Sequence, residues 1–292
     1  LYTFSNTRIK ELDEIPSPYS SGLLDPFFND GQLVPMLQTN RGCPFTCTFC
    51  ADGRDTVNQV NKFSIERITN DIEYIAKHVP KNIHTLFITD LNYGMLPGDL
   101  ETSKTIAKMK EKYNYPHRIL ATTGKNQKEK IIKSIESLGG ILSLSMSVQS
   151  LDDDVLHNVR RSNISTDRML GLTPSIKKSG LSTIAEIIVG LPGDTYKSNL
   201  ETIRKLVNTK LDDILQYTCM ILQGSEMGTP EQLSKWKFQT KYQILPEDFT
   251  TLSNGKRICE YGEYVVSSKD LSFDEYLELR MIALTLWLTN KG

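Results

Sequence analysis

The strongest constraint on the fold of this chain is an alternation of short apolar runs with longer stretches of helical period, which starts near Leu33. This alternation is typical of repeated βα units around a parallel sheet. In the first helical stretch, isoleucines recur at steps of three and four residues after Ser64, a residue type that caps helices. The predicted strands are residues 34–39, 84–89, 118–122, 141–148, 182–189 and 214–221.

Further helices are predicted between these strands, at residues 100–113, 127–138 and 199–206. Gly139 and Gly140 supply the left-handed end of the second of them, and Asp194 is the expected cap before the third. Six βα units are fewer than the eight of a closed barrel. The pattern itself therefore leaves two architectures open, a partial barrel and a doubly wound sheet.

The pattern changes near both ends of the chain. Residues 1–32 are expected to form a linker or extended arm, because the stretch Glu14–Gly22 is rich in Pro, Ser and Gly. A barrel domain at residues 33–222 follows, and residues 223–292 form a C-terminal extension that caps the sheet. Within the extension the pattern loosens over residues 224–246. A strand at 263–267 and an amphipathic helix at 273–288 then close the chain.

Composition narrows the class of partner. The chain has 34 Lys and Arg against 35 Asp and Glu, so electrostatics give no reason to expect broad binding to nucleic acid or anionic membranes. A specific ligand remains open, and the partner that we expect is a small-molecule substrate of unknown class. No apolar run approaches the ~20 residues that span a bilayer, and the start lacks signal-peptide order, so a cytoplasmic protein is expected. The first residue is Leu, not Met, and we expect a processed or truncated piece.

Three of the five cysteines, Cys43, Cys47 and Cys50, lie within eight positions directly after the first predicted strand. In parallel α/β folds this end of the strands binds ligands. Thiolates suit zinc or iron–sulfur clusters, and closed sites of both kinds normally take four protein ligands. Three local thiols favour a cluster with one open iron. The alternative is a zinc or redox-inert site completed by Cys219 or Cys259, which are otherwise expected to be small buried residues.

The spacing Cys-x3-Cys-x-aromatic-Cys after a first strand resembles the signature loop of the radical S-adenosylmethionine (SAM) enzymes. The resemblance implies an α/β fold, a partial (β/α)6 TIM-like barrel with a C-terminal α+β extension. It also implies that Cys43, Cys47 and Cys50 bind a [4Fe–4S] cluster whose fourth iron is chelated by SAM. Phe49, just before the last cysteine, would pack near the adenine.

Polar residues at the end of the second predicted strand fit this resemblance. Asp90 and Asn92 share one face of the strand, on the side of the cysteines. Asp-x-Asn-aromatic-Gly resembles the variant, common in the cobalamin-associated branch, of the motif that receives the methionine amino group of SAM. The plain alternative is an Asx turn that leads to Gly94.

Later strand ends also carry polar residues inside apolar runs, and buried polar groups need partners. By resemblance to the branch of oxygen-independent coproporphyrinogen oxidase, Gln149 and Glu186 would bind the ribose hydroxyls of SAM. Arg161 would meet the methionine carboxylate, although Arg160 beside it is an equal alternative. Gly190 would allow the backbone to approach the adenine, or it simply forms a tight turn.

The resemblance implies that a reduced cluster cleaves SAM and that the resulting radical functionalises or methylates an unactivated carbon of a substrate of unknown class. An electron donor such as flavodoxin or ferredoxin is then required. Cobalamin use, through a domain outside these residues, is a further implication of the branch. The competing interpretation is a non-catalytic iron–sulfur protein, either an electron carrier or a redox sensor. A third is an auxiliary piece of a longer enzyme.

Overall fold

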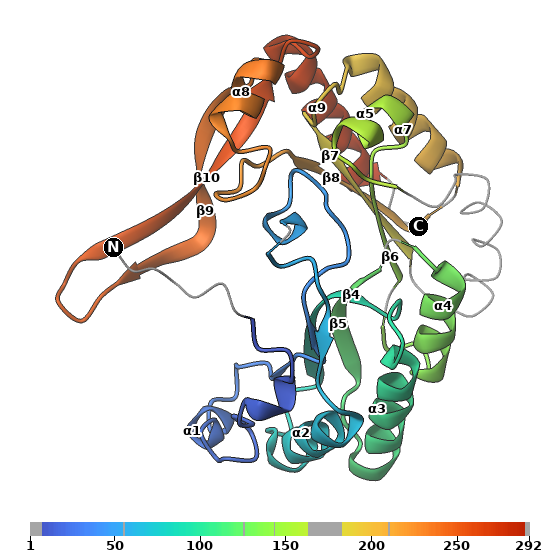
Figure 1. The fold of residues 1–292 in the computed structure, drawn as a ribbon, viewed down its shortest axis with the longest axis vertical. Helices are drawn as coiled ribbons and strands as arrows, with labels where there is room; N and C mark the ends of the chain where they lie inside the picture. The colour runs from blue at the N-terminus through green and yellow to red at the C-terminus, as the bar shows by residue number, and fades with distance from the viewer. Residues whose placement is uncertain are drawn as a thin grey trace. The chain divides into compact units, whose positions relative to one another are not determined.

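Strands and helices alternate in the computed structural model as the sequence pattern predicts (Figure 1). All six predicted strands of the βα series are present. They are β1 (Met36–Leu37), β4 (Thr85–Tyr93), β5 (Arg118–Thr123), β6 (Leu144–Gln149), β7 (Thr183–Val189) and β8 (Asp213–Thr218). The structure describes residues 8–54, 56–124, 126–142, 144–162, 183–209 and 211–289. Residues 143 and 182 of the predicted strands lie outside these ranges.

The chain divides into two compact units, and the boundary passes through the cysteine loop. Cys43 belongs to the first unit, whereas Cys47 and Cys50 belong to the second. The first unit comprises Leu1–Pro44, Thr56–Met146 and Ile164–Ile184, and the second comprises Phe45–Asp55, Ser147–Asn163 and Ala185–Gly292.

In the first unit, β1, β4 and β5 form a parallel sheet in the order β1-β4-β5. Helices α2 (Ile65–His78), α3 (Asp99–Tyr113) and α4 (Lys128–Ser137) lie side by side next to it (Figure 1). The predicted isoleucine stripe of α2 is confirmed, because Ile68, Ile72 and Ile75 are buried. Ser64 caps the helix and accepts a hydrogen bond from the Arg67 backbone at 3.1 Å.

The N-terminal segment of this unit contains a 3₁₀ turn at Leu12–Glu14 and a short helix, α1 (Asp25–Phe28). Leu12 and Tyr19 are buried, and the Ser17 hydroxyl donates a 2.5 Å hydrogen bond to Asp71 on α2. A small antiparallel pair, β2 (Asn40–Arg41) with β3 (Asn61–Lys62), flanks the cysteine loop. The described part of residues 1–32 therefore packs against α2.

Two strand boundaries near the cysteine loop differ from the prediction. β1 is shorter than residues 34–39, and β4 continues beyond residue 89 to Tyr93. The buried Asp90 carboxylate of β4 accepts hydrogen bonds from the backbone N–H groups of Thr39 and Asn40, at 2.7 and 3.3 Å. Thr39 and Asn40 thus bind a side chain of β4 beyond the β1 ladder, which ends at Leu37, while β4 runs on through polar positions that the sequence pattern marks as strand ends.

Strands β6, β7 and β8 form a sheet in the order β6-β7-β8, and the second unit contains β8 together with the carboxyl-terminal parts of β6 and β7. Helix α5 (Asp153–Asn158) follows β6, and α7 (Tyr196–Asn208) joins β7 to β8. The predicted left-handed end after α4, in the first unit, is also confirmed, with φ of 65° at Gly139 and 79° at Gly140.

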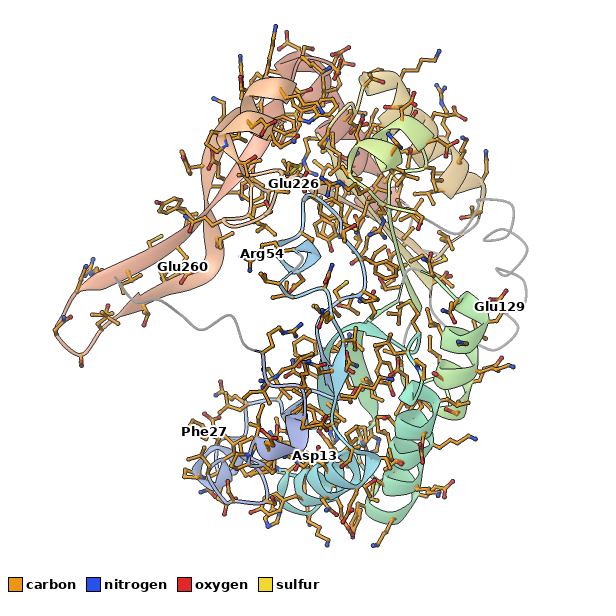
Figure 2. The ribbon with its side chains drawn as sticks, in the orientation of Figure 1. Asp13, Phe27, Arg54, Glu129, Glu226 and Glu260 are labelled. Atoms are coloured by element: carbon orange, nitrogen blue, oxygen red, sulfur yellow. The ribbon has the colours of Figure 1, made fainter. Side chains whose placement is uncertain are left out.

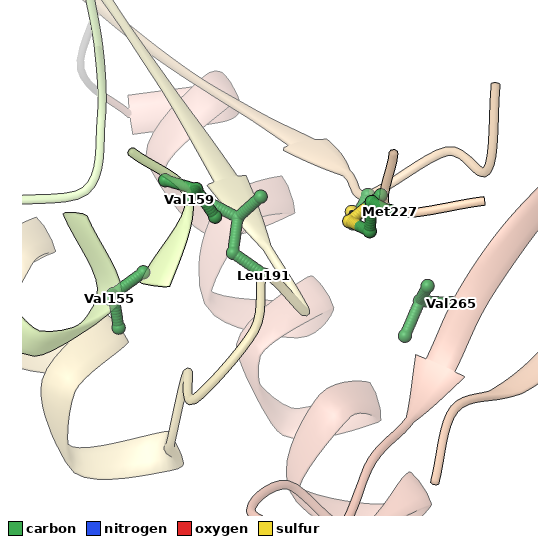
Figure 3. Close-up of a cluster of buried hydrophobic side chains, with 6 residues drawn as sticks. Val155, Val159, Leu191, Met227 and Val265 are labelled. Carbon is green, nitrogen blue, oxygen red and sulfur yellow. The ribbon is translucent and has the colours of Figure 1, made fainter. Parts of the chain in front are cut away.

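A buried apolar cluster holds the second unit together (Figure 3). It joins α5 to the segments that follow β7 and β8 and to Val265 on the chain's last strand, and Phe49 of the cysteine loop packs against it. Its fully buried members are Val155, Val159, Leu191, Cys219, Met227 and Val265.

Regular elements are present over residues 224–246, where the sequence pattern loosens and predicts none. Helix α8 (Pro230–Trp236) is followed by a long antiparallel hairpin of β9 (Gln239–Thr251) and β10 (Arg257–Ser267) (Figure 1). Large side chains such as Tyr242 and Phe249 are exposed along it, so no apolar face repeats at every second residue. Cys259 lies on β10 and is exposed, contrary to the expectation that it is buried.

Helix α9 (Phe273–Thr289) is present where the closing helix was predicted. It packs on β8, where Arg280 donates to the Gln216 carbonyl at 2.8 Å and the Tyr276 and Thr218 hydroxyls lie 3.0 Å apart. The helix is less amphipathic than expected, because apolar residues such as Met281 and Leu288 are exposed. None of the described helices is long and apolar enough to cross a membrane.

The start of α7 corrects one further prediction. Thr195, not Asp194, caps the helix, and its side chain accepts from Ser198 in a capping box. Asp194 is 1% exposed and accepts hydrogen bonds from the Gly190 backbone (3.0 Å), the Ser198 hydroxyl (3.0 Å) and the Asn199 amide (2.9 Å). The carboxylate thus ties the end of β7 to the first turn of α7.

This buried carboxylate predicts a pH dependence of stability. Burial raises the pKa of Asp194 from its ordinary 3.8 to about 6, against the opposing effect of its three hydrogen bonds. Protonation therefore favours the folded chain, and the stabilisation is lost as the pH rises through about 6. As the pH rises from about 5.5 to 7.5, deprotonation of Asp194 alone lowers the free energy of unfolding by about 1 kcal/mol.

We expect Asp194→Asn to remove that part of the pH dependence. The remaining oxygen can accept from Gly190 and Asn199 while the new amide donates to Ser198, so the fold is retained. Urea unfolding at the two pH values measures the effect. Asp153→Asn, at an exposed position of α5, is the control. An unchanged slope in Asp194→Asn would contradict the assignment.

Candidate functional site

The entry to the cysteine loop lies in the first unit and is fixed by Asp90. This carboxylate is 2% exposed and accepts four hydrogen bonds, two from the backbone N–H groups that follow β1 and two from side chains. The side-chain donors are the Asn40 amide, at 2.8 Å, and the Thr39 hydroxyl. Burial raises the pKa of Asp90 to about 6, although these hydrogen bonds favour the charged form.

One contact of Gly42 and one of Asn92 fix the chain from Asn40 to Cys43. Gly42 has φ of 104°, and a Cβ there would lie only 2.0 Å from the Gln59 carbonyl oxygen, so the residue before the first cysteine must be glycine. The Asn92 side-chain amide donates to the Cys43 sulfur at 3.2 Å. Both polar residues of the β4 motif thus contact the segment that leads into the cysteine loop, and their side chains do not close a local Asx turn.

The rest of the cysteine loop lies in the second unit and is tightly turned. Cys50 N–H donates to the Cys47 carbonyl at 3.1 Å, and Gly53 N–H donates to the Cys50 carbonyl at 3.2 Å. A Cβ on Gly53 would lie 2.4 Å from the Cys47 carbonyl oxygen. These two consecutive turns fix the backbone conformation that carries Cys47 and Cys50.

Backbone bonds on both sides of Thr48 anchor this half of the loop to its unit. Its N–H donates to the Val159 carbonyl at 3.1 Å, and its carbonyl accepts from Met227 N–H at 2.8 Å. Its hydroxyl oxygen is buried and has no hydrogen-bond partner in the described part of the chain. Sequence reasoning missed Thr48, because a threonine between two cysteines carries no recognisable signal.

A polar cavity of about 260 Å³ lies beside these residues in the second unit. Arg160 forms an ion pair with Glu226 at its wall and has φ of 50°, which is unusual for a residue other than glycine. Arg54 and Glu226, labelled in Figure 2, come from segments far apart in the sequence. The lining residues are Thr46, Cys47, Thr48, Cys50, Gly53, Arg54, Arg160 and Glu226.

A second polar group in the same unit is centred on Ser147 of β6. The Ser147 hydroxyl donates to the Glu186 carboxylate on β7, and its carbonyl accepts from the Arg161 guanidinium. Glu186 and Arg161, separated by 25 positions in the sequence, thus converge on one residue. This confirms no ligand contact, but it brings two of the predicted SAM-binding side chains together.

Gln149, two residues further along β6, is the most unusual of the predicted site residues. Its φ is 64°, in the left-handed region that residues other than glycine rarely adopt. Its side-chain oxygen is buried and has no hydrogen-bond partner among the described residues. Strain and an unsatisfied buried acceptor each cost about 1–3 kcal/mol. Folding alone gives no reason for either feature.

Gly190, Phe49 and Cys219 lie at or beside the buried apolar cluster of this unit. Gly190 has φ of 90°, and a Cβ there would contact Val265 at 3.4 Å, so backbone and β10 approach closely at this point. Phe49 packs against the buried cluster of Figure 3. Cys219 is fully buried in that cluster, and burial raises the pKa of its thiol.

The donor set of the cysteine loop fits an iron–sulfur cluster in its chemistry. Cys43, Cys47 and Cys50 offer three soft sulfur ligands within eight residues, and a buried amide already points at one of them. Among the described residues, no three His, Cys, Asp or Glu side chains are gathered closely enough to hold a metal ion. The assignment of the three thiols as ligands stays a prediction from their spacing.

The Asp90 contacts generate a prediction about folding. Asp90→Ala leaves the buried donors of Thr39 and Asn40 without their acceptor, so we expect the free energy of unfolding to fall by roughly 3 kcal/mol. Thr39→Val removes a single hydroxyl donor and should cost about 1 kcal/mol. Urea unfolding measures both. Equal stability of Asp90→Ala and the wild type would show that the carboxylate does not hold this segment.

The family profile described as the radical SAM superfamily matches residues 37–206, which include all three clustered cysteines. The chain is 30% identical over 242 residues to the cobalamin-dependent radical SAM methyltransferase TokK of Streptomyces tokunonensis. It is equally similar to the 2-(S-pantetheinyl)-carbapenam-3-carboxylate methyltransferase of Streptantibioticus cattleyicolor. Each match covers 80% of this chain and 35% of the relative. The chain thus spans about a third of these relatives.

Solved structures show the same fold at low identity. The radical SAM methyltransferase TsrM from Kitasatospora setae, with a SAM analogue and tryptophan bound, aligns with a TM-score of 0.63 at 12% identity, over 87% of this chain and 52% of that one. The cobalamin-dependent SAM radical enzyme OxsB aligns with a TM-score of 0.58 at 14% identity, over 97% and 44%. The expected α/β fold, a partial TIM-like barrel, and the expected likeness to the cobalamin-associated branch are confirmed, and the chain belongs to the radical SAM superfamily.

Proposed function

We propose that this chain is the radical SAM portion of an enzyme that cleaves SAM reductively and methylates or otherwise functionalises an unactivated carbon of a small molecule. The observation that carries the proposal is Gln149, which lies two residues from the point where Glu186 and Arg161 converge. Its backbone is strained, and its buried oxygen has no partner among the residues that the structure describes. A polar group that folding leaves unsatisfied is suited to a ligand with hydroxyl donors, such as a ribose.

Cys43, Cys47 and Cys50 would hold a [4Fe–4S] cluster by their thiolates. When bound, the cluster would supply one electron to SAM, and a carbon–sulfur bond of SAM would break with methionine as the leaving group. The turns at Cys50 and Gly53 keep two of the thiols in a fixed loop. Gln149 and Glu186 would accept hydrogen bonds from the ribose hydroxyls, and Phe49 and Gly190 would flank the adenine.

For the methionine carboxylate, the contacts favour Arg160 over Arg161. Arg160 lines the same cavity as Cys47 and Cys50, and its partner Glu226 is partly exposed and can give way to a ligand carboxylate. Arg161 is engaged with the Ser147 carbonyl beside Glu186. An arginine is suited to a carboxylate in either case, because its guanidinium donates two parallel hydrogen bonds.

Methyl transfer and a need for cobalamin are taken from the relatives, of which this chain spans only part. We propose flavodoxin or ferredoxin as the electron donor. The competing function, a non-catalytic iron–sulfur protein, accounts for the cysteines and leaves the strained Gln149 without a role.

The test of function is product formation. Anaerobically reconstituted protein with dithionite should convert SAM to 5′-deoxyadenosine or, with cobalamin present, to S-adenosylhomocysteine. Cys50→Ala should lose the visible absorbance of the cluster and both products, whereas Cys259→Ala, on the exposed hairpin, should keep them. Fully loaded protein that forms neither product would favour the non-catalytic alternative, and full iron occupancy in Cys50→Ala would refute the ligand assignment.

The role of Gln149 has a separate test. Gln149→Gly removes the side chain and relieves the left-handed strain, so stability should stay the same or rise by up to about 1 kcal/mol. The affinity for SAM should fall by about tenfold, the effect of roughly one lost hydrogen bond. Isothermal titration and urea unfolding measure the two effects.

The matched control for Gln149→Gly is Lys237→Gly. Lys237 has φ of 50° at the end of α8 and no proposed ligand role. It should gain stability without a change in SAM affinity. Unchanged SAM affinity in Gln149→Gly would remove the observation on which the proposed function rests.

A further inference from the structure

The contact between Asn92 and Cys43 suggests a role for Asn92 that differs from binding SAM. Its side-chain nitrogen lies 3.2 Å from the Cys43 sulfur and donates a hydrogen bond to it. Asn92 is 6% exposed, so its amide is already committed inside the first unit. We propose that Asn92 is a positioning residue for Cys43 that raises the reduction potential of the cluster. This inference rests on the proposed function.

The amide is held in place by its neighbours on β4. Two residues earlier, the Asp90 carboxylate binds Thr39 and Asn40. One residue later, the Tyr93 ring is fully buried, and its hydroxyl lies 2.7 Å from that of Ser103 on α3. Asn92 therefore sits between two anchored residues, which fix the stretch of backbone from which its amide reaches the sulfur.

Gly42 limits the sulfur side of the contact in the same way. Its left-handed backbone packs against the Gln59 carbonyl with no room for a Cβ, which fixes the direction in which the chain enters Cys43. Donor and acceptor thus come from two segments of one unit, each restrained by contacts that involve no ligand. The hydrogen bond is preformed.

A preformed donor to a ligand sulfur has a defined electrostatic effect. Adding an electron to a cluster increases the negative charge on its sulfurs, so a hydrogen bond stabilises the reduced state more than the oxidised state. Removing the donor should make reduction about tenfold less favourable, which is a fall of about 59 mV for a one-electron couple. A contact to the methionine amino group would predict weaker SAM binding and an unchanged potential.

The experiment is an EPR-monitored redox titration of the reconstituted protein without SAM, followed by SAM titration. Asn92→Leu keeps the shape and loses the donor, and it should lower the potential by the stated amount. Asn92→Asp places a carboxylate beside the sulfur and should lower it further. Gln149→Gly, proposed above to weaken SAM binding, is the control and should leave the potential unchanged.

One measurement needs no variant. If Asn92 donates to the sulfur, exchange of the wild-type protein into deuterated water should shift the iron–sulfur stretching bands in the resonance Raman spectrum, and Asn92→Leu or Asn92→Ser should reduce that shift. Potentials of the Asn92 variants equal to the wild-type value, together with loss of SAM affinity, would overturn the inference.

Different results would contradict the proposed function and the role of Asn92. A wild-type protein that takes up no cluster, or whose loaded form does not cleave SAM, contradicts the proposed function. A wild-type protein that cleaves SAM, with Asn92 variants of unchanged potential, contradicts only the role of Asn92.

Discussion

The buried carboxylate of Asp90 is the interaction on which the candidate site depends. It stands on β4 and accepts hydrogen bonds from Thr39 and Asn40, which follow β1, so it holds the segment that leads from the first strand to the cysteine loop. The cost of burying it is visible in its raised pKa, to about 6. The four donors that surround it offset part of that cost. Asn92 lies two residues after Asp90 on the same strand, and its side chain contacts Cys43.

The second unit uses buried polar groups in the same manner. Asp194 ties β7 to α7, and Ser147 brings Glu186 and Arg161 together. Gln149 differs from them because its buried oxygen has no partner among the described residues and its backbone is strained. Satisfied polar groups explain the fold, and the combination of backbone strain with an unpartnered acceptor at Gln149 is the basis of the proposed ligand contact.

Much of this arrangement could be predicted from the sequence. The βα alternation gave all six strands, and the isoleucine stripe after Ser64 gave α2, because period and capping are local properties. The cysteine spacing and the polar strand ends pointed to the family that the comparisons confirm. Residues such as Gln149 and Glu186 could be found only as polar positions inside apolar runs, and their ligand roles remain untested.

Other features could not be predicted because they arise from contacts between distant segments. The segment after β1 is held by a carboxylate 51 positions away, and no local pattern around Thr39 reveals that bond. The hairpin of β9 and β10 lacks period-two alternation, since large side chains such as Tyr242 and Tyr261 pair in solvent with ring centroids 5.4 Å apart. Asp194 looked like a cap because it precedes α7, but Thr195 has the geometry that capping needs.

The central claim is that three thiolates leave one iron open for SAM. It is tested most directly by electron–nuclear double resonance of the reduced, reconstituted protein with SAM whose methionine amino group carries ¹⁵N. We expect a ¹⁵N hyperfine coupling between the cluster and the labelled nitrogen, which is replaced by a ¹⁴N coupling when unlabelled SAM is used. A cluster signal that is unaffected by SAM and shows no coupling to the label would contradict the open iron, and with it the proposed chemistry.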